Sequence, residues 1–136
     1  NYREATAVVT ERQPTKGEWR DMLFSWRVAA HTRSNAVVIA KDEAAVAIGT
    51  GKQERIDAIE DALGKAVRKG HKGDLPGSVL ASDGFMLKDN ISPLYDEGVS
   101  AIIQPGGGLS DQALIEEANK KGMAMVFTGE RVFSHF

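Results

Sequence analysis

The apolar positions of this chain follow two alternating patterns, one typical of strands and one typical of helices. Short apolar runs predict strands at residues 4–10, 35–40, 44–49, 79–81, 101–103 and 123–127. The run at 35–40 is almost free of polar residues, which is typical of a strand covered on both faces. Only residues 41–43 separate it from the next run, so these two strands should form a hairpin.

Between these runs, apolar residues three and four positions apart predict helices. The first helix should follow Thr15, which forms a capping-box signature with Glu18, and the others should cover 53–69, 91–98 and 110–122. Alternating strands and helices indicate a three-layer α/β domain. We expect a mixed sheet in which the hairpin is antiparallel and the later strands are parallel.

The composition narrows the classes of function. The 136 residues most simply form one domain, and no apolar run approaches the roughly 20 residues of a membrane span. Its 17 basic and 19 acidic residues are interspersed, which gives no reason to expect a nucleic-acid or membrane partner. The absence of cysteine excludes disulfides and thiolate metal ligands and suits a cytoplasmic protein. Since the sequence begins at Asn1 without an initiator methionine, we expect a piece of a longer polypeptide.

Residues 101–111, AIIQPGGGLSD, place three glycines between a predicted strand and a predicted helix, as phosphate loops do. A Walker loop would need Lys-Ser or Lys-Thr after the glycines, and a dinucleotide loop would need glycine where Asp111 stands. Two interpretations remain. Either the glycines form a tight turn and Ser110 or Asp111 caps the following helix, or the segment is a site where exposed backbone N–H groups meet an anion.

Two further segments contain candidate binding residues. Phe85 lies in the predicted loop 82–90, which is either directed to the core or stacks a flat ligand ring while Asp89 accepts from the ring N–H groups. Arg55 in the first turn of a helix opposes the helix dipole, which is typical of a solvated charge or an anion site. The histidines lack metal-ligand spacing and are expected to be structural or solvated; they are His31, His71 and His135.

Five stretches of the chain resemble one family, the bifunctional AICAR formyltransferase/IMP cyclohydrolases of purine biosynthesis. The stretches occur in the family's order, at 8–42, 47–57, 79–90, 101–119 and 122–136. The resemblance implies that residues 1–136 are the C-terminal cytidine-deaminase-like unit of the transformylase region. It also implies that the zinc site is absent, because PGGG at 105–108 stands where zinc deaminases carry Pro-Cys-x-x-Cys.

The resemblance also implies roles for individual residues. Asn35 would be a catalytic residue near the folate and the reacting amine, and Asp89 would recognise the folate. Arg55 would bind the nucleotide, Phe85 would pack on the substrate, and Arg131 would lie near the nucleotide phosphate. Two departures from the family pattern are present. The loop at 82–90 is one residue shorter than the family's SDAFFPFRDN, and the chain ends in FSHF where the family often has basic or histidine residues.

The implied reaction transfers a formyl group from 10-formyltetrahydrofolate to the amine of AICAR, without a metal at the reaction centre. The implied enzyme is a homodimer with a shared active site, and its proton-transferring Lys-His pair lies in a preceding unit. Our alternative hypothesis is a non-catalytic scaffold or dimerisation unit, for which the resemblance allows a structural potassium ion.

Overall fold

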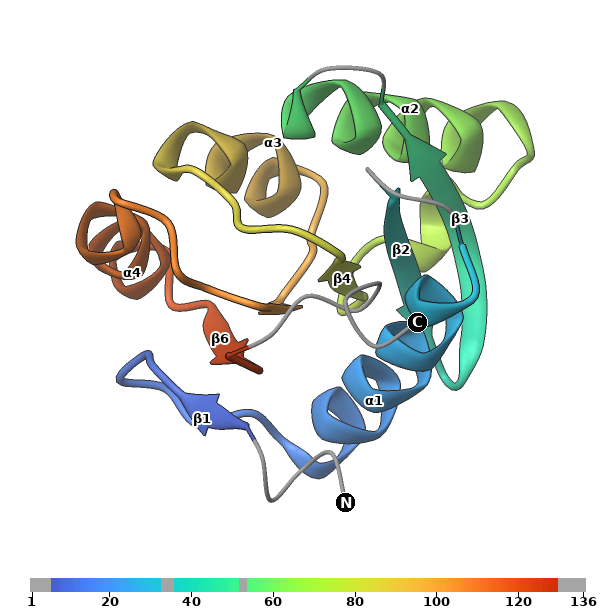
Figure 1. The fold of residues 1–136 in the computed structure, drawn as a ribbon. Helices are drawn as coiled ribbons and strands as arrows, with labels where there is room; N and C mark the ends of the chain where they lie inside the picture. The colour runs from blue at the N-terminus through green and yellow to red at the C-terminus, as the bar shows by residue number, and fades with distance from the viewer. Residues whose placement is uncertain (1–5, 33–35, 52–53, 130–136) are drawn as a thin grey trace.

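One mixed sheet of six strands forms the middle layer of the computed structural model, which describes residues 6–32, 36–51 and 54–129 (Figure 1). The strands lie in the order β1-β6-β5-β4-β2-β3. Strands β4, β5 and β6 are parallel, whereas β2 is antiparallel to both β3 and β4, and β1 is antiparallel to β6. The bounds are Ala7–Val8 (β1), Ala36–Lys41 (β2), Ala44–Thr50 (β3), Val79–Ser82 (β4), Ala101–Gln104 (β5) and Ala124–Phe127 (β6). The mixed sheet and the hairpin are therefore confirmed.

The helices cover both faces of the sheet. Helix α1 packs on one face, and α2, α3 and α4 pack on the other, each face with its own apolar core. The bounds are Lys16–Ala30 (α1), Arg55–Arg68 (α2), Ile91–Asp96 (α3) and Asp111–Lys120 (α4), with short 3-10 helices at Lys72–Asp74 and Lys88–Asn90. Successive strand residues enter opposite cores; for example, Val37 and Ile39 face α2 while Val38 and Ala40 face α1. Burial on both faces explains the continuous apolar runs.

The first strand is the largest departure from the sequence-based expectation. A strand was predicted over 4–10; residues 4 and 5 lie outside the described residues, and of 6–10 only Ala7–Val8 form β1. It pairs with the edge of β6, and Val9 adds one more bond from its N–H to the carbonyl of Met125 (3.0 Å). The other strands and helices end within three residues of their predicted bounds. No helix among the described residues is long and apolar enough to cross a bilayer.

A buried carboxylate, Glu18, fixes the start of α1. Its side chain accepts from the N–H of Thr15 (2.9 Å), whose hydroxyl accepts from the N–H of Glu18 (3.1 Å), so the predicted capping box is present. Arg12 donates to both carboxylate oxygens of Glu18 at 2.9 Å, and the hydroxyl of Ser100 donates at 2.7 Å. Arg12 also donates to the carbonyl of Gly122 at 2.7 Å. This network therefore joins α1 to the turns that precede β5 and β6.

The turn between β2 and β3 depends on a second buried carboxylate. Asp42 and Glu43 both adopt positive φ, 53° and 58°, which suits the right-handed twist of a hairpin but is unfavourable for residues other than glycine. The carboxylate of Asp21 on α1 accepts from both turn N–H groups, at 3.0 and 2.9 Å, and is 4% exposed. Asp21 thus compensates for the strain of the turn.

Replacing Asp21 by alanine should lower the free energy of unfolding by about 2 kcal/mol, because two turn N–H groups lose their acceptor in a strained turn. Urea unfolding of the chain measures this loss. Asp74→Ala, which removes a half-exposed carboxylate, is the matched control and should change stability by less than about 0.5 kcal/mol. Equal stabilities for the two variants would contradict the role of Asp21.

Glu18 should make stability fall as the pH is lowered. Burial alone would raise the pKa of Glu18, but the bonds from Arg12, Thr15 and Ser100 outweigh it and hold the pKa below its ordinary value of 4.5. The unfolded chain therefore takes up the proton first, so the contribution of Glu18 is complete above about pH 5 and is lost as the pH falls through the folded pKa. Urea unfolding at about pH 6, 5, 4 and 3 should show a shallower decline in the free energy of unfolding for Glu18→Gln than for the unmodified chain.

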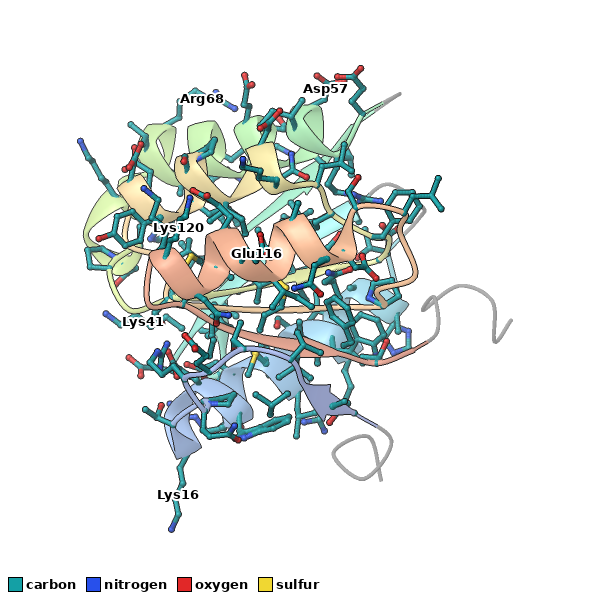
Figure 2. The ribbon with its side chains drawn as sticks, turned by 90° about the vertical axis from the view of Figure 1, so that its left-hand side faces the viewer. Lys16, Lys41, Asp57, Arg68, Glu116 and Lys120 are labelled. Atoms are coloured by element: carbon teal, nitrogen blue, oxygen red, sulfur yellow. The ribbon has the colours of Figure 1, made fainter. Side chains whose placement is uncertain are left out.

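Glu116→Gln is the control for this pH series, since Glu116 lies on the exposed face of α4, turned away from the sheet (Figure 2). It removes the same charge without touching the Glu18 network, so it should leave the pH profile close to that of the unmodified chain. A parallel decline for Glu18→Gln and the unmodified chain would contradict the assignment.

Candidate functional site

The candidate site lies at the edge of the sheet where the parallel strands have their carboxyl ends. The connections that follow β4, β5 and β6 all leave from this edge. The start of β2 and the end of β3 meet there too, because Val37 pairs with Ser82 and Ala36 pairs with Thr50. Ligands of α/β proteins commonly bind at this edge, where loops replace the covering helices.

Two glycines bring the first turn of α2 close to this edge. A Cβ on Gly49 would overlap the carbonyl oxygen of Ala58, and a Cβ on Gly51 would lie 2.8 Å from the backbone nitrogen of Ala58. The sequence GTG at 49–51 therefore allows β3 and α2 to approach closely. Arg55, the first residue of α2, is thereby placed beside the ends of β2 and β4.

Arg55 forms a buried ion pair. Its Nη1 lies 2.7 Å from Oδ1 of Asp83, and the two side chains are 10% and 2% exposed. The same Nη1 donates to the carbonyl of Ala36 at 3.3 Å. Nε of Arg55 is buried and has no hydrogen-bond partner among the described residues. Of the two sequence-based interpretations of Arg55, a solvated charge is therefore wrong.

Asp83 was not assigned a role from the sequence, although it holds this cluster together. Its Oδ2 accepts from the N–H of Ala36 (3.2 Å), and its own N–H donates to the carbonyl of Ala36 (3.2 Å). The available signal was its place directly after β4, a strand whose four residues are all buried. Its partner Arg55 is distant in sequence, so no local pattern could predict the pair.

The loop after β4 divides its apolar residues between the core and the surface. Met86 is 1% exposed and belongs to the core, whereas Phe85 is 42% exposed. The ring of Phe85 lies against Gly108, where a Cβ would be 2.8 Å from a ring carbon. The absence of a side chain at 108 therefore makes room for Phe85 beside the glycine turn.

Asp89 lies in the 3-10 helix at the end of the same loop and is exposed. Asn90 anchors this helix, since its Oδ1 accepts from the N–H of Leu87 at 2.8 Å and its side chain is buried. Asp89 itself forms no hydrogen bond or ion pair with another described residue. The loop thus leaves both Phe85 and Asp89 exposed.

The glycine turn is satisfied by side chains of its own segment. The N–H groups of Gly107 and Gly108 donate to the carboxylate of Asp111 at 2.8 and 3.2 Å. The N–H of Gly106 donates to Oε1 of Gln104 at 2.9 Å. The predicted turn is therefore confirmed, with positive φ at Gly106 and Gly107. The predicted cap is wrong, because Ser110 is the N-cap residue of α4 and its side chain forms no cap hydrogen bond, while Asp111 accepts from the turn instead. The anion that meets these N–H groups is thus a residue of the chain.

The remaining candidates are not brought to this edge by the described structure. Asn35, Arg131 and His135 lie outside the described residues. His31 follows the end of α1 and is exposed, and His71 is half-exposed with its Nδ1 3.5 Å from Asp74. In the part of the chain that is described, no group of three or more histidine, aspartate or glutamate side chains is placed to hold a metal ion.

Comparisons with known proteins agree with this sequence resemblance. The family model for the AICARFT/IMPCHase bienzyme matches residues 1–65. The bifunctional purine biosynthesis protein PurH of Aquifex aeolicus is 47% identical over 133 residues, which are 97% of this chain and 26% of that protein. PurH of Persephonella marina is 48% identical over 129 residues, which are 94% of this chain and 25% of that protein. The chain spans about a quarter of the length of these curated relatives. Over nearly its whole length, the chain is therefore similar in sequence to a part of these bifunctional purine biosynthesis proteins.

Proposed function

We propose that this chain is part of a formyltransferase that moves the formyl group of 10-formyltetrahydrofolate to the 5-amino group of AICAR in IMP synthesis. In this proposal the unit supplies residues that bind the nucleotide and the folate. The observation that carries it is Arg55, which is nine-tenths buried at the edge of the sheet where the parallel strands end, and whose Nε has no partner in the described part of the chain. Such a donor is rare in a folded protein and suits an anionic ligand.

The same proposal gives the domain a cytidine-deaminase-like fold without zinc. The strand order β3-β2-β4-β5-β6, with helices on both faces, supports this fold. The glycines at 106–108 carry no side chain that could bind zinc, and their N–H groups are already bonded to Gln104 and Asp111. The proposal therefore includes no metal at the reaction centre.

In the proposed reaction, the amine nitrogen of AICAR attacks the formyl carbon, the bond from that carbon to N10 of the folate breaks, and one proton passes from the amine to N10. Arg55 binds the anionic nucleotide, Phe85 packs on a flat ring, and Asp89 accepts from the N–H groups of the pterin. Asn35 and Arg131 are the other residues assigned to this site. A Lys-His pair in another unit supplies acid and base catalysis, on the order of 10²- to 10⁴-fold.

The whole enzyme in this proposal is a cytoplasmic homodimer with a shared active site and a second, IMP cyclohydrolase activity. The alternative is a scaffold or dimerisation unit, with a structural potassium ion. Exposed apolar side chains near the candidate site favour this alternative, because such side chains commonly mark a contact surface; they are Phe85, Leu87 and Leu109. Tests of ligand binding separate the two functions.

Replacing Arg55 by glutamine in the full-length polypeptide that carries this chain should raise the KM for AICAR about 10-fold or more, because a charged donor to the nucleotide is lost. Steady-state formyl transfer and calorimetric titration with AICAR measure this change. The matched control is Arg68→Gln, which removes the same charge from the exposed far end of α2 (Figure 2). An unchanged affinity for AICAR in the Arg55 variant would overturn the assignment and favour the scaffold.

Replacing Asp89 by asparagine should raise the KM for 10-formyltetrahydrofolate about 10-fold and leave the KM for AICAR unchanged, because one charged acceptor for the pterin is lost. The control is Asp96→Asn, an exposed carboxylate at the end of α3. Both constants come from the same formyl-transfer assay with one substrate varied at a time. If Asp89→Asn and Asp96→Asn behave alike toward folate, Asp89 does not bind the pterin.

A further inference from the structure

We propose that Asp83 is a positioning residue for AICAR binding, and that it acts by holding the guanidinium of Arg55. This inference rests on the proposed function, since Arg55 must bind the nucleotide for its orientation to matter. The observation that carries it is the buried contact of 2.7 Å between Oδ1 of Asp83 and Nη1 of Arg55. The sequence alone did not assign a role to Asp83.

Asp83 is itself fixed before it meets Arg55. It is 1% exposed, and it exchanges two hydrogen bonds with the backbone of Ala36 at the start of β2. One of its oxygens is used for Ala36 and the other for Arg55. A carboxylate held on both sides in this way can set the position of a long, flexible side chain.

The contact leaves part of the guanidinium for a ligand. Both side-chain hydrogen bonds between Arg55 and other described residues use Nη1, one to Asp83 and one to the carbonyl of Ala36. Nε is buried without a partner among the described residues. Nη2 forms no hydrogen bond with a described residue and is not one of the fully buried atoms without a partner, so it is the charged donor that remains for a phosphate or carboxylate oxygen.

A purely structural ion pair would produce different behaviour. Removing one partner of such a pair destabilises the fold, but it does not change ligand affinity through the other partner. If Asp83 acts through Arg55, its effect on AICAR binding must disappear once Arg55 can no longer bind the nucleotide. Coupling between the two positions is therefore the property that separates positioning from structural support.

The experiment is a double-mutant cycle in the full-length polypeptide, with Asp83→Asn, Arg55→Gln and both together. Asparagine keeps the size of Asp83 and an acceptor for the N–H of Ala36. We expect Asp83→Asn to raise the KM for AICAR on the order of 10-fold with a much smaller change in kcat, and to add no further rise in the Arg55→Gln background. Asp83→Glu, which retains the charge, should raise the KM less than Asp83→Asn.

Each outcome decides a different point. The positioning role would be overturned if Asp83→Asn left the KM for AICAR unchanged, or raised it by the same factor with arginine and with glutamine at position 55. In that case an effect of Arg55→Gln on the KM would still support the proposed function. An Arg55→Gln variant with an unchanged KM would instead overturn the nucleotide-binding assignment on which both proposals rest. If thermal unfolding shows that Asp83→Asn does not fold, the cycle is measured with Asp83→Glu, for which the same loss of effect in the Arg55→Gln background is expected.

Discussion

Burial of the central strands on both faces is the constraint that organises this domain. Because helices cover both sides of β2, β4, β5 and β6, the side chains along these strands are apolar almost without exception. Polar side chains can be accommodated mainly where a strand ends and the chain leaves the two cores. Three parallel strands end at the same edge, so the connections that follow them collect the polar residues there. The position of the candidate site is thus a consequence of how the sheet is buried.

Buried carboxylates stabilise both ends of the sheet, but their partners differ. Glu18 and Asp21 lie toward the amino ends of the parallel strands and bind turns that precede or connect strands. Each accepts from several donors, and these contacts are explained by stability alone. Asp83 at the opposite edge likewise binds backbone, but Nε of its charged partner Arg55 is buried without an acceptor among the described residues. The hydroxyl of Ser78 is also buried without a partner there, but it is neutral. In the Glu18 network all three guanidinium nitrogens of Arg12 are bonded, so the unpaired nitrogen of a charged group distinguishes the Arg55 cluster.

The sequence predicts those features that depend on neighbours along the chain. Apolar runs predict the strands, and Thr15 with Glu18 predicts the start of α1, because both signals act within a few residues. The Asp42–Glu43 turn shows the limit, since its positive φ angles are stabilised by Asp21 from a distant helix and no glycine marks it. Arg55 and Phe85 could be selected as candidates from their unusual local settings, whereas the pairing of Arg55 with Asp83 depends on the sheet register. Asn35 and Arg131 stay predictions from the resemblance alone.

The glycine turn explains why anion recognition in the proposed site depends on a side chain. The N–H groups of a glycine turn before a helix form a natural anion site, but here Asp111 and Gln104 already occupy them. Asp111 also places a negative charge where a phosphate would otherwise bind, so a phosphate at this turn would have to displace a carboxylate fixed by the helix that it begins. No described residue competes in this way for Nε of Arg55. In the proposed function, the two arrangements together favour a nucleotide whose anionic group lies beside α2 and whose flat ring lies near Phe85.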